Sequence, residues 1–176
     1  TGELALIWQL DLPVNHIGDV LLDSASSALL VQGKAQDAIS GPSELFVVTG
    51  DGRIESRARP TGVGADWGLA WADVGTGRVV LQEMLWPQPG RAALRLSAAD
   101  LQGGSVGQPL ILSGITTVGR LPGDALLVAL SREAHTLTLV EGATLTLGAR
   151  VPLGVELRDL VTGEALDRIY VNDTAG

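Results

Sequence analysis

Only two histidines occur in this chain of 176 residues, and they are the first candidates for acid–base or metal chemistry. His16 follows Pro13-Val14-Asn15 in an expected connection between strands, whereas His135 stands at the start of an expected strand. A metal site needs three or four converging ligands, and no cysteine is available to add a thiolate. We therefore predict no metal site and no cofactor, and keep His16 as a candidate for ligand contact.

Acidic side chains are numerous but dispersed along the chain. Asp23 and Asp73 follow equivalent expected strands, where an Asp side chain commonly accepts hydrogen bonds from turn backbone groups. A glycosidase needs two carboxylates at a defined separation, and no spacing here predicts such a pair. No Gly-x-Ser-x-Gly motif is matched to a histidine. The sequence therefore favours a protein that is not an enzyme, and a hydrolase with dispersed acid and base residues is the third hypothesis.

Tryptophan supplies most of the aromatic content, with four residues against one Tyr and one Phe. Trp67 and Trp71 share strand parity, which predicts that both point to one face of a sheet. Trp86 directly precedes Pro87 in the stretch 86–90, which also contains Pro89 and which we predict to be a loop. Large aromatic side chains are enriched at protein interfaces, so Trp86 is the tryptophan that most favours a binding role.

The expected loops gather the candidate binding residues on one face of the molecule. The longest insertion, residues 32–43, contains Lys34 and is expected beside the other connections of that face. The candidate ligand- or partner-binding residues are His16, Lys34, Asp66, Trp67, Trp86 and Arg132. An ordinary solvated loop face is the alternative that this topology leaves open.

Composition excludes several classes of partner. The chain has 12 basic and 20 acidic residues, a formal net charge of −8, and Lys34 is its single lysine. Binding to nucleic acid needs Lys and Arg clustered on one face, so neither a nucleic acid nor an anionic membrane surface is expected as a partner. No apolar run approaches the roughly 18 residues of a spanning helix, so membrane insertion is not expected.

Short apolar runs recur at regular intervals and indicate an internal repeat. Their last residues are 50, 47 and 43 positions apart, and each run follows residues that favour turns. We interpret them as second strands of four-stranded units, because repeats of about 40–50 residues are typical of β-propeller blades. The four runs are 28–31, 78–81, 125–128 and 168–171.

The other strands of each unit are expected around these runs. The expected first strands are 17–22, 67–72, 115–120 and 155–161. The expected third strands are 44–49, 92–97, 136–140 and, wrapping around the chain ends, 3–8. Each fourth strand is expected to end near a proline, because proline cannot donate to a ladder and is tolerated at an outer edge. These prolines are Pro13, Pro60, Pro109 and Pro152.

The sequence thus predicts an all-β fold in a single domain, residues 1–176: a β-propeller of four four-stranded blades with interleaved N- and C-terminal strands. The units are approximately 16–60, 61–112, 113–154, and 155–176 plus 1–15. Interleaving would hold both chain ends in a ladder instead of leaving them frayed. A partial ring of a larger propeller and a β-sandwich remain as alternatives.

Stretches 124–129, 136–140 and 149–154 of the third unit resemble a repeat of the YVTN/YncE-like bacterial propellers. The C-terminal Asp167-Arg168-Ile169-Tyr170-Val171-Asn172 is similar to the "rlYVaN" core of those repeats. The resemblance covers about half of the chain; the usual "SPDG" turn is absent and residues 67–112 match poorly. It implies a propeller fold, in a family of mostly larger, often extracytoplasmic rings that act as scaffolds or binding modules.

A repeat framework without an assembled catalytic set predicts a non-enzymatic interaction or scaffold module. Its expected partner is another protein or a second copy of the chain. An extracytoplasmic location, periplasmic or secreted, is expected. The alternative function is a small-ligand or carbohydrate binder that uses the face of Trp86 and His16.

Overall fold

The part of the chain that the structure describes is all-β. The computed structural model describes residues 9–23, 25–35, 42–89, 91–121, 126–131, 133–154, 157–162 and 169–173. These ranges form strands and turns but no helix. They accordingly hold no helix long and apolar enough to cross a membrane.

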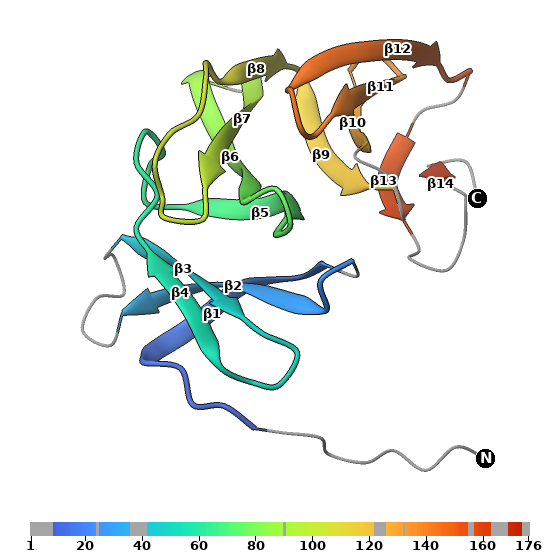
Figure 1. Cartoon of the computed structure of the whole chain (residues 1–176). Helices are drawn as coiled ribbons and strands as arrows, with labels where there is room; N and C mark the ends of the chain where they lie inside the picture. The colour runs from blue at the N-terminus through green and yellow to red at the C-terminus, as the bar shows by residue number, and fades with distance from the viewer. Residues whose placement is uncertain are drawn as a thin grey trace, which may run out of the picture.

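Three four-stranded antiparallel sheets follow one another along the chain, each with its strands in sequence order (Figure 1). Sheet 1 contains β1 (Val14–Asp23), β2 (Ala28–Ala35), β3 (Ser43–Val48) and β4 (Ile54–Ala58). Sheet 2 contains β5 (Trp67–Asp73), β6 (Arg78–Gln88), β7 (Arg91–Asp100) and β8 (Leu110–Ser113). Sheet 3 contains β9 (Ile115–Arg120), β10 (Leu126–Ser131), β11 (Thr136–Glu141) and β12 (Thr146–Pro152). A two-stranded sheet contains β13 (Leu157–Thr162) and β14 (Ile169–Asp173).

This arrangement confirms the all-β class and the predicted order of strands within the first three units. β9 has the predicted bounds, and β3, β7 and β11 lie within a few residues of the predicted third strands. The predicted turn roles of two aspartates are confirmed as well. Asp23 accepts hydrogen bonds from Ala25 N at 3.3 Å and Ser26 Oγ at 2.5 Å, and Asp73 accepts one from Thr76 N at 3.1 Å.

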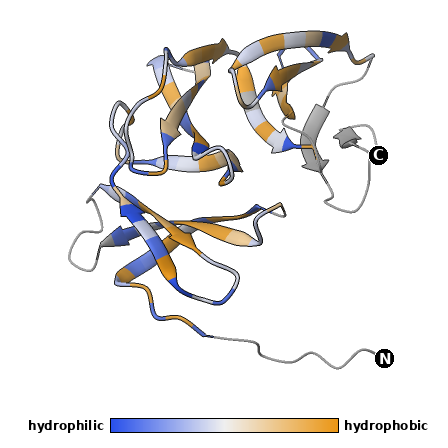
Figure 2. Cartoon of the chain, viewed as in Figure 1, coloured by the Kyte–Doolittle hydropathy of each residue, from blue (hydrophilic) through white to orange (hydrophobic). Residues whose placement is uncertain are grey.

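The three sheets stack face to face through two apolar clusters, because each sheet has an alternating pattern that buries aliphatic side chains. Figure 2 shows the hydrophobic residues concentrated on the strands and the hydrophilic ones on the turns. The cluster between sheets 1 and 2 contains Leu30, Leu45, Trp67, Leu69, Ala72, Val79, Leu81 and Ala99. The cluster between sheets 2 and 3 includes Trp71, Val80, Leu94, Leu96, Leu112, Leu127, Ala129 and Val140.

Sheets 1 and 3 each carry a second apolar face that points away from this stack. On sheet 3 that face contains Val128, Leu130 and Leu137. On sheet 1 it contains Val31, Phe46 and Val48. The β1 edge of this face on sheet 1 is more open. Val20 and Leu22 of β1, which pair with β2 on this face, are 57% and 40% exposed.

The N-terminal residues lie against this outer face of sheet 1 instead of forming a strand. Leu10 and Leu12 pack on the cluster of Val31, Phe46 and Val48, and residues 9–13 have no strand geometry. The predicted fourth strand that would end near Pro13 is therefore wrong, since its leucines cover a neighbouring face. The predicted third strand 3–8 lies outside the described residues.

Two further predictions about unit 2 are wrong. β8 begins directly after Pro109, so that proline precedes the outer strand and does not end it. Trp86 lies within β6 and not in a loop. β6 pairs with β5 only as far as Glu83, opposite Trp67, but its pairing with β7 continues to Gln88. A register shift between Leu85 and Gln88 leaves the proline of this stretch outside regular pairing, which removes the need for its missing N–H.

Trp67 and Trp71 point to opposite faces of sheet 2, contrary to the prediction. β5 holds one residue more than β6 between Leu69 and Trp71, and such a β-bulge reverses the alternation of side chains. Trp67 therefore packs against sheet 1, whereas Trp71 packs against sheet 3.

A one-residue bulge of the same kind interrupts the first strand of every unit. It lies between Ile17 and Val20 in β1, at Ala70 in β5, at Thr116 in β9 and at Arg158 in β13. The two-stranded sheet thus shares with the three complete sheets both its antiparallel pairing and the irregularity of its first strand.

Candidate functional site

The predicted binding residues lie on one side of the sheets, where the first and third strands begin and the second and fourth strands end. We call it the start side. His16 lies near the start of β1, Lys34 near the end of β2, and Asp66 directly before β5. Trp86 lies near the end of β6. Arg132 lies outside the described residues, between Ser131 and Glu133.

Three of the predicted residues come together between sheets 1 and 2. His16 and Lys34 are ladder partners of β1 and β2, so their side chains stand on the same face. Lys34 Nζ donates to Asp66 Oδ1 at 2.8 Å, although Asp66 is 87% exposed and Lys34 is 20% exposed. This ion pair holds the single lysine of the chain against the connection that leads into sheet 2.

A buried polar network holds the connection from β4 to β5 in place. Gln32 Nε2 donates to Trp67 O at 2.5 Å and to Ser43 Oγ at 3.0 Å. Ser43 Oγ in turn donates to Ala65 O at 3.1 Å. Trp67 itself is only 3% exposed, so it contributes a backbone acceptor and core packing, and its ring is not available to a ligand.

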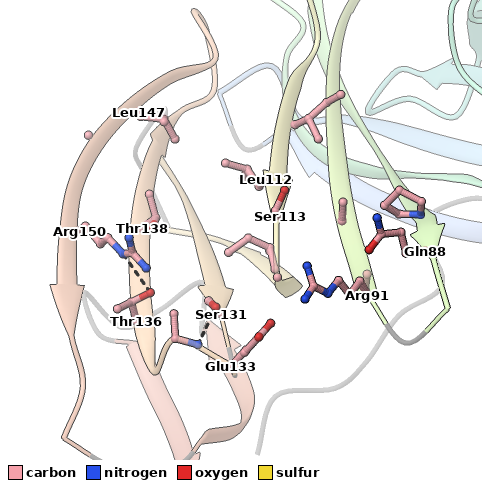
Figure 3. Close-up of a pocket in the computed structure, with 18 residues that line it drawn as sticks. Gln88, Arg91, Leu112, Ser113, Ser131, Glu133, Thr136, Thr138, Leu147 and Arg150 are labelled. Carbon is pink, nitrogen blue, oxygen red and sulfur yellow. Dashed lines mark hydrogen bonds between the residues drawn. The ribbon is translucent and has the colours of Figure 1, made fainter.

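A groove of about 860 Å³ opens on the start side between sheets 2 and 3 (Figure 3). The β6–β7 hairpin with Pro87, Gln88 and Arg91 bounds one end, and the β10–β11 turn with Glu133 bounds the other. β8 and β12 form the two walls, with Leu112 of β8 and Leu147 of β12 as apolar side chains. Hydroxyl groups line the space between them: Ser113, Ser131, Thr136 and Thr138.

The floor of the groove is the short connection from β8 to β9. Gly114 makes this connection with a φ of 70°, in the left-handed region that glycine adopts without strain. Its N–H donates to Ala92 O at 3.0 Å. A Cβ here would lie 3.5 Å from the Glu133 carboxylate and 3.6 Å from Ser131 Oγ, at ordinary van der Waals distance. The connection therefore needs glycine for its backbone conformation and not for lack of space.

Sequence reasoning missed most of this groove. The candidate residues include Trp86 and Arg132, which are the immediate neighbours of Pro87 and Glu133 in the lining. The exposed aliphatic residues Ile111 and Leu147 are 56% and 53% exposed on outer strands. Their position in two separate sheets gives no local signal in the sequence.

The described residues do not assemble a metal centre or a nucleophile. Nowhere in the described ranges do three or more His, Asp or Glu side chains gather as a metal site would require. Residues 103–107 have the letters Gly-x-Ser-x-Gly, but they lie in the β7–β8 connection, where Ser105 bridges to Ala99. A nucleophile elbow needs a strand followed by a helix, and a strand follows here.

Comparison with known proteins places no family name on this chain. No protein-family model matches the sequence, and no curated protein matches it significantly.

Proposed function

We propose that this chain is a non-catalytic β-propeller interaction module. Three consecutive sheets have the same strand order, and their first strands lie side by side: β1 with β5, and β5 with β9. β13 lies beside β9 in the same manner. Blades of a propeller place their first strands around a common axis and their fourth strands outside, which is the arrangement that these contacts favour.

A contact between sheets 1 and 3 supports a ring over an open stack. Arg120, at the end of β9, donates from Nη1 to Leu22 O of β1 at 3.0 Å. The two strands belong to units that are not neighbours in the sequence. A linear stack of three sheets would keep sheet 2 between them, whereas first strands around one axis can meet across it.

In this proposal β13 and β14 are the first two strands of a fourth blade, and the N-terminal strand 3–8 is its third. The shared bulge in β13 supports the assignment. The apolar outer faces of sheets 1 and 3 would then both pack on this blade. A larger ring completed by a second copy is the alternative, and an extracytoplasmic location remains part of the proposal.

The groove between sheets 2 and 3 carries the functional proposal. An open space of about 860 Å³ with exposed Leu147 fits an extended segment of a partner protein. Protein interfaces combine apolar and polar groups, and the lining of this groove contains both, with apolar side chains on its walls and hydroxyl groups between them. We therefore infer that the chain binds a protein partner through a short segment.

Selection from a random peptide library on the immobilised full chain tests this function. We expect enriched peptides whose binding is lost in Leu147→Arg, which places a long charged side chain in the groove. Ile54→Arg is the matched control, because Ile54 is also an exposed apolar residue, 40% accessible, on an outer strand of another sheet. Enrichment that survives Leu147→Arg, or no enrichment, would contradict the proposal.

A carbohydrate ligand is the second candidate, and the exposure of Trp86 favours it. Trp86 is 68% exposed and directly precedes Pro87 of the groove. An exposed indole ring offers an apolar face on which sugar rings commonly stack. A change in tryptophan fluorescence with a glycan panel that disappears in Trp86→Ala would support it, and no response across the panel would exclude it.

A further inference from the structure

We propose that the groove between sheets 2 and 3 selects an extended acidic peptide segment, whose carboxylates bind Arg91 and Arg150 while an apolar side chain contacts Leu147. This inference rests on the proposed function, because it names the chemistry of the partner segment that the same groove would take.

The guanidinium groups of Arg91 and Arg150 differ from those of other arginines in their partners. Six other arginines of the described ranges donate to a carboxylate or a main-chain carbonyl. The carboxylate pairs are Arg53 with Asp51, Arg57 and Arg59 with Glu44, and Arg95 with Glu83. The carbonyl contacts are Arg78 with Ala143 and Arg120 with Leu22.

Arg91 and Arg150 differ from this group. In the described ranges Arg91 has no ion pair, and Arg150 donates only from Nε, to Thr136 Oγ1 at 3.3 Å. That bond orients Arg150 and leaves its two terminal nitrogens for a ligand. A guanidinium binds a carboxylate through two parallel hydrogen bonds. Two such groups without carboxylate partners therefore indicate an anionic ligand.

Arg91 and Arg150 lie on opposite sides of the groove. Arg91 begins β7 in sheet 2 and Arg150 lies on β12 in sheet 3, so they flank the groove from its two sides (Figure 3). Leu147 lies on the outer strand of sheet 3 and also lines the groove. A segment that reaches both arginines must cross the groove between the two sheets, where Leu147 offers an apolar contact. This arrangement predicts acidic residues together with an apolar one.

The groove differs in charge from the rest of the molecule. The whole chain has a formal net charge of −8, which disfavours the approach of an acidic partner. The lining of the groove contains two arginines and one carboxylate, Glu133. An acidic segment is therefore favoured at this site over the remaining surface. Glu133 can accept a backbone N–H of the segment.

A pair of synthetic peptides tests the inference on the full chain. The probe is a fluorescein-labelled ten-residue peptide that alternates Asp with Leu, and its counterpart alternates Asn with Leu. Fluorescence anisotropy gives the two dissociation constants. We expect the Asp peptide to bind at least about tenfold more tightly, because charge-assisted bidentate hydrogen bonds are much stronger than neutral ones. We also expect its binding to weaken as salt concentration rises.

Variants assign this preference to the two arginines. Arg91→Gln and Arg150→Gln should each weaken binding of the Asp peptide by about tenfold and leave binding of the Asn peptide unchanged. Arg53→Gln is the matched control, since Arg53 is an 81% exposed arginine on another sheet connection. Circular dichroism spectra of all variants exclude loss of the fold.

The outcomes separate this inference from the function on which it rests. Equal binding of the two peptides, lost in Leu147→Arg, would overturn the acidic preference and leave the peptide-binding function in place. An acidic preference that Arg91→Gln and Arg150→Gln do not change would place it elsewhere and overturn the inference. Binding of neither peptide, together with a failed library selection, would overturn both.

Discussion

Glu44 is a buried carboxylate of sheet 1 that forms ion pairs with two arginines. Its side chain is 3% exposed, and its two oxygens accept hydrogen bonds from Arg57 Nε at 2.7 Å and Arg59 Nε at 2.8 Å. Arg57 also lies over the ring of Phe46, 5.6 Å from its centre. Burial raises the pKa of the Glu44 carboxyl group, but the hydrogen bonds and charges of the two arginines outweigh it, so this pKa lies below its usual value.

We predict that Glu44→Gln lowers the free energy of unfolding by roughly 1–3 kcal/mol at neutral pH, the usual contribution of hydrogen bonds to a charged group. Because the pKa of Glu44 is lower in the folded state, its contribution is fully present above the unfolded-state pKa of about 4.3 and is lost as pH falls through the folded value. Urea unfolding at neutral and acidic pH measures both effects.

The control for this prediction is Glu55→Gln, an exposed glutamate on the neighbouring strand β4. It should leave the unfolding free energy within about 0.5 kcal/mol of the wild-type value. If the difference between Glu44→Gln and the wild type stayed constant from neutral pH to pH values well below 4, the ion pair would not be its cause.

At the scale of strands, the positions of strands that contain a short apolar run between turns were predicted well. β2, β3 and β10 contain such runs, and each predicted run lies within one residue of the observed strand. Predictions failed where an irregular register decides the outcome. The bulge in β5 separates Trp67 from Trp71, and the register shift near the end of β6 places Trp86 in a strand.

The groove could not be predicted for a related reason. Its lining comes from two sheets, and which faces of those sheets meet depends on packing between residues far apart in the sequence. His16, Lys34 and Asp66 were predicted to share a side, and they do, because that prediction needs only the alternation of strand directions. The place of Leu147 in the groove depends on how the outer strands β8 and β12 lie relative to each other, which no local pattern in the sequence shows.

The bulge in β1 makes a specific contact between sheets. Asp19 lies within that bulge, and its Oδ2 accepts a hydrogen bond from Leu69 N of β5 at 2.9 Å, next to the bulge of β5. We predict that Asp19→Ala lowers the free energy of unfolding by roughly 1–3 kcal/mol, because a buried N–H loses its acceptor. Asp19→Asn retains an acceptor and should keep most of the stability. Equal losses in both variants, measured by urea unfolding, would contradict this explanation.

At the scale of the whole molecule, the apolar outer faces of sheets 1 and 3 are buried. Val31 and Phe46 of sheet 1 are 5% and 0% exposed, and Leu130 and Leu137 of sheet 3 are 0% and 8% exposed. The proposed fourth blade, packed on both sheets, would account for this burial, and burial of apolar surface is the largest driving force in folding.

If the termini interleave, removal of residues 1–8 takes a strand from the fourth blade. We predict that this truncation lowers the midpoint temperature of the entire unfolding transition by at least about 5 °C, since loss of about 1 kcal/mol shifts it by 2–4 °C in a chain of this size. Removal of residues 174–176, outside both proposed strands, is the control. Differential scanning calorimetry measures both truncations.

An unchanged midpoint temperature would contradict interleaved closure. Light scattering then distinguishes the remaining arrangements. A closed ring is expected as a monomer of 18.2 kDa. A stable dimer that forms through the outer faces would instead favour two partial rings that complete each other.

The bulged first strands imply that the units share a backbone feature and not a residue type. The extra residue has no common chemistry, since Ala70, Thr116 and Arg158 occupy the position in three of the units. What recurs is one additional peptide unit. Deleting Ala70 would remove the bulge but keep Trp67 opposite Glu83 and Trp71 opposite Val80, so the two indole rings would still point to opposite faces. Units of such a repeat can therefore lose all resemblance in their letters while they keep the same ladder partners.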